Sequence, residues 1–178
     1  MKIQTSRFGL VEVTVDDLIE FPEGLLGFNN LRKFVLLDDP TDDIFAWLQS
    51  CEDPTIAFPV LEPELFTAGY HIQLTKHDLD AVKLHAGEGF RTFMIITIPQ
   101  DPTQMTANMK APIVINVTRR MGRQCVLQDN QLAIREPIFA KLQQRVVQNP
   151  QVPIKSQTRE PKMPMRLATS RPPEPTAD

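Results

Sequence analysis

The sequence predicts a mostly β protein, a small antiparallel β-barrel or sandwich with two short helices. About ten short segments of strand-forming residues follow one another, with turn signals roughly every 8–12 residues. Helical periodicity, by contrast, is confined to two short segments. This combination is typical of barrels and sandwiches. The predicted strands are residues 2–5, 10–15, 33–37, 44–49, 56–61, 70–74, 91–98, 113–117, 123–128 and 131–135.

The strand predictions depend on the pattern of apolar residues. Val11, Val13 and Val15 alternate with polar residues, as in a half-buried strand, and a turn at Gly9 joins this strand to residues 2–5 as a hairpin. Residues 91–98 are almost continuously apolar, which indicates a central strand.

The two predicted helices have recognisable starts. Thr75, followed three residues later by Asp78, forms a variant of the capping box, so a short amphipathic helix is expected over residues 75–84. Pro137 begins the second helix, in which apolar residues recur every fourth position from Ile138.

A compact packed turn is expected at residues 21–28. Pro22, Gly24 and Gly27 prevent a long regular element. The apolar side chains of the same stretch favour burial, namely Phe21, Leu25, Leu26 and Phe28. The glycines are not spaced as in a nucleotide-binding loop, and no βαβ pattern surrounds them. We therefore expect them to serve the turn rather than a ligand.

The composition divides the chain into two parts. Residues 1–148 are expected to fold as one domain, long enough to bury a core without disulfides or metals. Residues 149–178 contain seven prolines but no aromatic residue and no glycine, so a disordered tail is expected. Five basic and three acidic residues give this tail a net charge of +2, whereas the whole chain carries −3.

The expected location is the cytoplasm. The amino end has no apolar signal region, and no apolar run approaches the ~18 residues of a membrane span. Mean hydropathy is −0.21. Cys51 and Cys125 lie in apolar-rich segments, where buried reduced thiols are favoured over a disulfide.

Charge argues against a protein that mainly binds nucleic acid. The acidic body lacks the basic footprint that displaces counterions from phosphates, and it suits a basic protein partner instead. Arg119, Arg120 and Arg123 form one basic cluster, for which a solvated turn is favoured over phosphate contact. A barrel that binds RNA directly through these arginines is the alternative hypothesis.

Motifs of catalysis and metal binding are missing from the sequence, so neither an enzyme nor a cofactor is predicted. The acidic turn at residues 38–43 lacks the order of a calcium loop. A hydrolase using Glu62 and Glu64 is a further alternative, but nothing in the sequence fixes their geometry. The histidines at positions 71, 77 and 85 lack the spacing of a helical metal site.

The stretch from residue 105 to 117 is the best candidate for a recognition surface. Its second half is a β-branched strand that starts at Pro112. Thr106 and Asn108 favour a short helical turn or ordered loop before it. Polar loops on rigid strands are common binding sites, although these two residues can equally serve only to cap a turn. The predicted partner-binding residues are Met105, Thr106, Ala107, Asn108 and Asn116.

Several stretches together carry a family resemblance. They are KIQTSRFG at 2–9, FPEGLLGF at 21–28, FVLL at 34–37, WLQS at 47–50, MTANMKAPIVIN at 105–116 and GRQ at 122–124. In this order they resemble the FliW family of flagellar assembly factors.

The resemblance covers the chain from Met1 to about Pro137. It implies a small non-enzymatic β-barrel-like protein of the bacterial cytoplasm, with flagellin and the translational repressor CsrA as mutually exclusive partners. Binding would keep CsrA from flagellin messenger RNA. The resemblance implies no cofactor, no direct nucleic-acid contact and no membrane contact.

Overall fold

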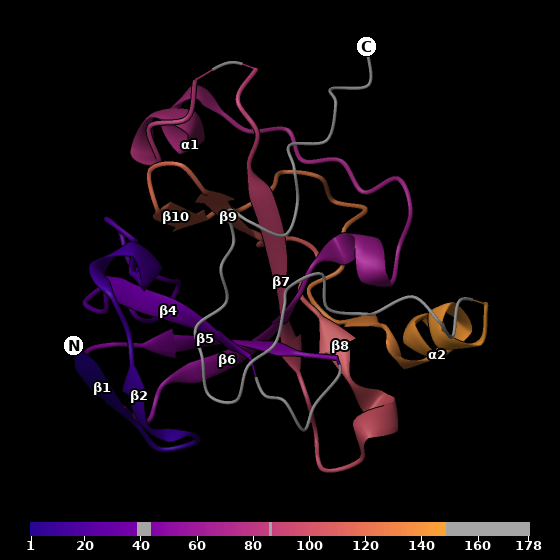
Figure 1. Ribbon diagram of the computed structural model, residues 1–178. Coiled ribbons are helices and arrows are strands. Elements are labelled where there is room, and N and C mark those ends of the chain that lie inside the picture. Colours follow the sequence, from indigo (N-terminus) through magenta and orange to yellow (C-terminus); the bar gives the residue numbers. More distant parts are fainter. Residues whose placement is uncertain (39–43, 86, 149–178) are drawn as a thin grey trace.

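Seven strands close into a β-barrel in the computed structural model, which describes residues 1–38, 44–85 and 87–148 (Figure 1). The strands are β3 (Ile19–Glu20), β4 (Lys33–Asp38), β5 (Ala46–Ser50), β6 (Ala57–Leu61), β7 (Arg91–Thr97), β9 (Ile113–Asn116) and β10 (Met121–Gln124). Their order is β7-β6-β5-β4-β3-β10-β9, and β9 pairs back with β7 to close the ring. Neighbouring strands are antiparallel except β3 and β10, which are parallel. The predicted fold class is confirmed.

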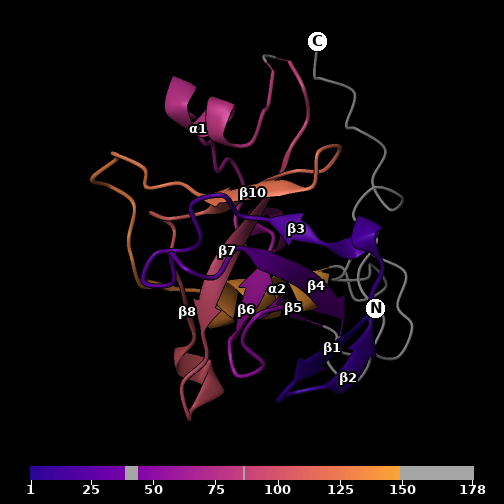
Figure 2. The same cartoon turned by 90° about the vertical axis from the view of Figure 1, so that its left-hand side faces the viewer.

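Smaller elements surround the ring (Figures 1 and 2). A separate hairpin is formed by β1 (Lys2–Thr5) and β2 (Gly9–Glu12), while β8 (Thr106–Ala107) and β11 (Glu136–Pro137) extend the sheet beside β7. The helices are α1 (Lys76–Ala81), α2 (Phe139–Gln148) and three 3-10 helices, η1 (Val15–Asp17), η2 (Pro63–Leu65) and η3 (Pro102–Gln104).

The central strands are buried on both faces. In β4, Phe34 and Leu36 point into the barrel core, whereas Val35 and Leu37 pack outside it beneath the β1–β2 hairpin. Side chains alternate between the faces of a strand, so both faces need a cover. The hairpin supplies the outer cover with four buried apolar side chains, Ile3, Phe8, Val11 and Val13.

The second outer core lies where α2 packs against β7 and β8. Met94 and Ile96 of β7 point toward Ile138 and Leu142, while Phe93 on the same strand faces the barrel interior. The almost continuous apolar sequence of residues 91–98 therefore reflects burial on both faces of a central strand, as predicted.

Two predicted strands are wrong. Residues 70–74 keep the expected alternation of burial but pair with no strand among the described residues, because the free part of β7 is taken by β8. Tyr70 is fixed instead by its hydroxyl, which donates to the Met109 carbonyl at 2.6 Å. Residues 131–135 form turns, and the short strand β11 follows them.

Three local predictions also need correction. Thr106 and Ala107, expected in a helical turn or loop, form β8 because the ladders of β7 and β11 satisfy their backbone groups. Pro137 belongs to β11, and α2 begins at Phe139. The strand predicted at residues 123–128 is β10, which runs from Met121 to Gln124. Residues 125–128 belong to no strand.

The predicted capping box and free thiols are confirmed, whereas two other predictions concern residues outside the described ranges. The capping box of α1 is formed, since the Thr75 hydroxyl accepts from the Asp78 amide and the Asp78 carboxylate accepts from the Thr75 amide. Cys51 and Cys125 are free thiols. The acidic turn at 39–43 and the tail at 149–178 lie outside the described residues, so the predicted domain boundary stays a prediction.

A close contact fixes the turn at residues 21–28 against β10. The Phe21 ring is fully buried and meets the Phe34 ring edge to face, with centroids 5.2 Å apart. A Cβ atom at Gly122 would lie 2.5 Å from the Phe21 ring. Gly122 is therefore required by packing, because any side chain there would displace the ring.

Replacing Gly122 by Ala should destabilise the domain by about 1–3 kcal/mol, because the buried Phe21 ring must shift. Chemical denaturation would measure the free energy of unfolding. The matched control is Gly89→Ala, since no atom lies within 4 Å of a Cβ built there. Equal stability of the two variants would contradict the packing role of Gly122.

Candidate functional site

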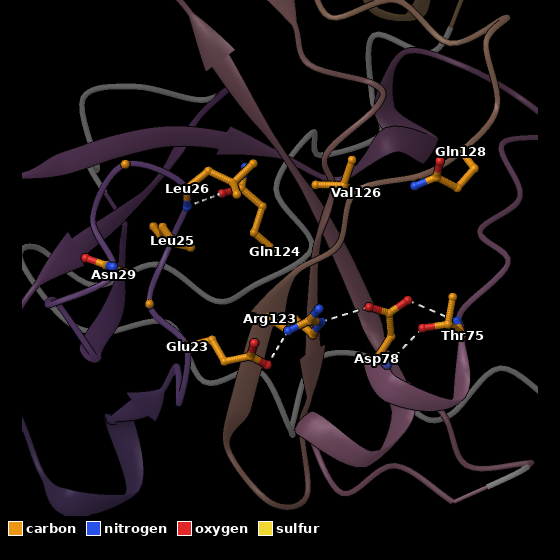
Figure 3. A pocket seen from close by; sticks show the side chains of 12 residues that line it. Glu23, Leu25, Leu26, Asn29, Thr75, Asp78, Arg123, Gln124, Val126 and Gln128 are labelled. Atoms are coloured by element: carbon orange, nitrogen blue, oxygen red, sulfur yellow. Dashed lines mark hydrogen bonds and ion pairs between the residues drawn. The ribbon is translucent and has the colours of Figure 1, made fainter.

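An open cleft of about 640 Å³ lies between the turn that follows β3 and the segment that follows β10 (Figure 3). The amino end of α1 borders it. The cleft is lined by Glu23, Gly24, Leu25, Leu26, Gly27, Asn29, Thr75, Asp78, Arg123, Gln124, Val126 and Gln128. It thus combines residues from three parts of the sequence.

The first wall is the turn at residues 21–28, whose backbone points Leu26 outward. Gly24 and Gly27 have φ values of +65° and +82°, which L-residues rarely adopt. A Cβ at Gly24 would also lie 2.5 Å from the Phe28 carbonyl oxygen. As a result, Leu25 is buried in the barrel core while Leu26 remains 57% exposed.

The second wall is an extended segment after β10 that rests on residues 110–112. The Cys125 amide donates to the Pro112 carbonyl at 2.9 Å, and the Leu127 amide donates to the Lys110 carbonyl at 2.8 Å. Cys125 and Leu127 point inward, so Val126 between them is 50% exposed. The intervening residues Gln124, Val126 and Gln128 line the cleft.

A side-chain hydrogen bond joins the two walls. The Gln124 Oε1 atom accepts from the Leu26 amide at 2.9 Å, and its Nε2 atom donates to the Ala111 carbonyl at 3.2 Å. The Gln124 amide group therefore holds the first wall, the second wall and the supporting stretch together.

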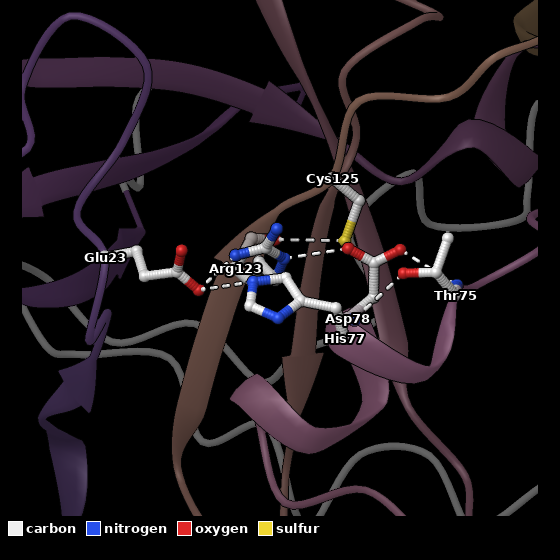
Figure 4. A network of polar contacts seen from close by, with 6 residues as sticks. All are labelled: Glu23, Thr75, His77, Asp78, Arg123 and Cys125. Atoms are coloured by element: carbon white, nitrogen blue, oxygen red, sulfur yellow. Dashed lines mark hydrogen bonds and ion pairs between the residues drawn. The ribbon is translucent and has the colours of Figure 1, made fainter.

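An ion-pair network centred on Arg123 fixes the remaining side of the cleft (Figure 4). Its Nε atom donates to Asp78 Oδ1 at 2.8 Å, and its Nη1 atom donates to Glu23. His77 Nε2 lies 3.5 Å from the same Glu23 carboxylate. One guanidinium thus links α1 to the turn at residues 21–28.

The network shifts the ionisation of its members. The Arg123 hydrogen bond holds the pKa of Glu23 below its usual value. Burial opposes ionisation of Asp78, but hydrogen bonds from Arg123 and Thr75 outweigh it and lower the pKa of Asp78. Burial raises the pKa of the nearby Cys125 thiol to about 12, so this cysteine is a thiol at neutral pH.

The predicted partner-binding residues occupy two different environments. Met105 and Ala107 are buried beside α2, and Asn116 is 1% exposed. The Asn116 amide donates to the carbonyls of Val82 at 2.9 Å and Lys83 at 3.2 Å. Thr106 and Asn108 are half-buried. A partner-binding role for the five residues stays a prediction.

The stretch from residue 105 to 117, predicted as a recognition surface, supports one wall of the cleft. Residues 110–112 bind the wall that carries Val126, as described above. Sequence reasoning missed the cleft itself, because its walls are far apart along the chain. The sequence contains no signal for it, because both leucines of the turn are expected to be buried and Cys125, Val126 and Leu127 are three apolar residues in a row. The structure corrects the first expectation, since Leu26 is 57% exposed.

The basic cluster is not free for phosphate contact. Arg120 donates to the carbonyls of Asp17 and Leu18, and burial lowers its pKa. Arg123 is engaged by two carboxylates, which leaves Arg119 as the exposed member. The structure therefore gives the RNA-binding alternative little support.

The other candidate sites do not assemble either. Glu62 is buried in an ion pair with Arg91, whereas Glu64 is exposed. Within residues 1–38, 44–85 and 87–148, no group of three or more histidine, cysteine or acidic side chains is placed to hold a metal ion. In the same described ranges, no helix has the length and apolarity needed to cross a membrane.

Comparison with known proteins places the chain in a family. The FliW protein family profile matches residues 2–138. The chain belongs to the FliW family. It is 68% identical over 158 residues to the flagellar assembly factor FliW of Bdellovibrio bacteriovorus, which covers 89% of this chain and 90% of that protein.

More distant FliW proteins agree with this assignment. The flagellar assembly factor FliW of Leptospira interrogans is 36% identical over 140 residues, covering 78% of this chain and 93% of that protein. A crystal structure of the flagellar assembly factor FliW superposes with a TM-score of 0.73 at 32% identity, covering 78% of this chain and 97% of that chain. The barrel is therefore the FliW fold.

Replacing Arg123 by Gln should lower the free energy of unfolding at pH 7 by about 1–3 kcal/mol, because the Asp78 carboxylate loses its charged partner. Lowered pKa values in the folded state mean that Glu23 and Asp78 stabilise it above their ordinary values of 4.5 and 3.8. This stability is lost as the pH falls through the folded-state pKa values. The difference between variant and wild type should therefore shrink below about pH 4.

Urea unfolding at pH 7 and at about pH 3 would measure this dependence. Arg119→Gln is the control, because the Arg119 side chain is exposed. A stability difference that is the same at both pH values would contradict the ion-pair explanation.

Proposed function

We propose that this FliW-family protein is a non-enzymatic flagellar assembly factor of the bacterial cytoplasm that binds flagellin and CsrA as alternative partners. Released from flagellin, it would bind CsrA and relieve repression of flagellin messenger RNA translation. The observation that carries the proposal is the 68% identity to a protein named flagellar assembly factor FliW over 89% of this chain.

Physical features of the chain favour protein partners. The whole chain carries a charge of −3 although its tail carries +2, so the folded part is acidic and suits a basic RNA-binding repressor. The cleft adds exposed aliphatic side chains to amide and charged groups, a combination common at protein interfaces.

A switch of this kind depends on differential affinity and concentration. Because flagellin and CsrA would exclude one another, the fraction of protein bound to CsrA would fall as free flagellin accumulates. Secretion of flagellin would then return the protein to CsrA. Such a titration is stoichiometric.

Calorimetric titration of the full chain with CsrA and with flagellin from the same organism tests the proposal. Each should give saturable heat, and saturation with one partner should abolish the heat of the other. If neither titration gives heat, the proposed function is overturned. If the second partner still gives heat after saturation with the first, mutual exclusion is overturned.

The predicted binding residues can be tested in the same assay. Thr106→Ala and Asn108→Ala should weaken partner binding with little change in melting temperature. Both residues are partly exposed at or beside the rigid strand β8, where a partner can reach them. Asn116→Ala is the contrasting variant. Its buried amide satisfies two carbonyls, so its loss should cost about 1–3 kcal/mol of stability.

Equal losses of binding and stability in Thr106→Ala and Asn108→Ala would mean that these residues only support the fold. Unchanged binding would place the partner surface elsewhere.

A further inference from the structure

The cleft leaves two aliphatic side chains uncovered beside a carboxylate. Leu26 and Val126, on opposite walls, are 57% and 50% exposed. Glu23 at the same cleft is about half-exposed, and its carboxylate contacts Arg123 and His77. Both aliphatic side chains lie at one concave site, where another segment of chain can cover them.

The polar lining suits an extended peptide. Asn29 and Gln128 line the cleft with side-chain amides, which can both donate to and accept from a peptide backbone. The charged lining residues are two carboxylates, Glu23 and Asp78, and one guanidinium, Arg123, so the cleft is slightly acidic. A segment that alternates aliphatic and basic side chains matches both features.

Such a segment occurs in the tail of this chain. Residues 162–167 read Lys-Met-Pro-Met-Arg-Leu, with three aliphatic or thioether side chains at alternate positions, one cation before the first of them and one between the last two. The segment contains no acidic residue. Its charge is opposite to that of the cleft.

The chain is long enough to bring the two together. α2 ends at Gln148, so 13 residues separate it from Lys162, and this linker can span roughly 45 Å when extended. A domain of about 150 residues is roughly 40 Å across. A tether of this length also gives an effective concentration on the order of millimolar, at which weak contacts become populated.

We propose that residues 162–167 bind in the cleft of the same chain. The side chains of Met163, Met165 and Leu167 would cover Leu26 and Val126, while Lys162 or Arg166 reaches Glu23. The tail would then compete with any partner protein that uses the cleft. That consequence rests on the proposed function, whereas the binding of the tail does not.

Site-specific photo-crosslinking tests the proposal without a partner. A benzophenone amino acid replaces Gln128, which lines the cleft, and Gln4 on β1 is the matched control because it is also an exposed glutamine. After irradiation of the dilute full chain, mass spectrometry should find cross-links from position 128 to residues 159–171. Cross-linking from position 4 to this segment should be much weaker.

Two sets of substitutions sharpen the result. Lys162→Glu with Arg166→Glu should lower the cross-link yield by about two- to fivefold, the range expected for exposed ion pairs. Leu26→Ser with Val126→Ser should lower it as well, and both side chains are exposed enough to be replaced without unfolding the domain.

Equal yields from positions 128 and 4 would overturn the proposal. A mixture of isotopically light and heavy chains distinguishes binding within one chain from binding between two copies. Cross-linked products of mixed mass would show that the tail of a second copy binds, and would overturn binding within one chain. The full chain with Lys162→Glu and Arg166→Glu should also bind flagellin or CsrA more tightly. If the wild-type chain binds neither, the proposed function fails while the cross-linking result stands.

Discussion

Pairing of β9 with β7 is the constraint on which the architecture depends. It closes the seven-strand ring, so every strand of the ring has two neighbours and no edge remains open there. Closure also puts apolar side chains of β4 and β7 on the outside, where the hairpin and α2 must cover them. Segments outside the ladders, such as the one that contains α1, are then tied to the ring in part by side chains.

Arg123 is the clearest example of such a side chain. It bonds Asp78 and Glu23, which lie 45 and 100 residues away in the sequence. The planar guanidinium can serve two carboxylates at once, which the point charge of a lysine does less well. Arg123 of β10 therefore holds the amino end of α1, and with it one side of the cleft, while Asn116 of β9 holds the carboxyl end of this helix through Val82 and Lys83.

The tail lies outside the family profile, although the match to the Bdellovibrio protein reaches into it. The FliW profile ends at residue 138, while the match to the Bdellovibrio protein covers 89% of this chain. The tail carries a net charge of +2 and the rest of the chain is acidic, which is the charge difference that the proposed binding in the cleft uses. Under the proposed choice between partners, a tail bound in the cleft would tune that choice through competition within the chain.

Local patterns in the sequence determined the strand-rich fold class, the hairpin at Gly9, the capping box at Thr75 and the central strand at residues 91–98, because alternation and capping act between residues close in sequence. The same patterns misplaced residues 70–74, which have the burial of a strand but no neighbour. Only the tertiary structure decided that Met105, Ala107 and Asn116 face inward, and that Leu26, Val126 and Glu23 meet at one cleft. Which strands pair, and how a closed sheet curves, depend on contacts between residues far apart in the sequence. Hydrophobicity and spacing act between near neighbours, so they do not determine these contacts.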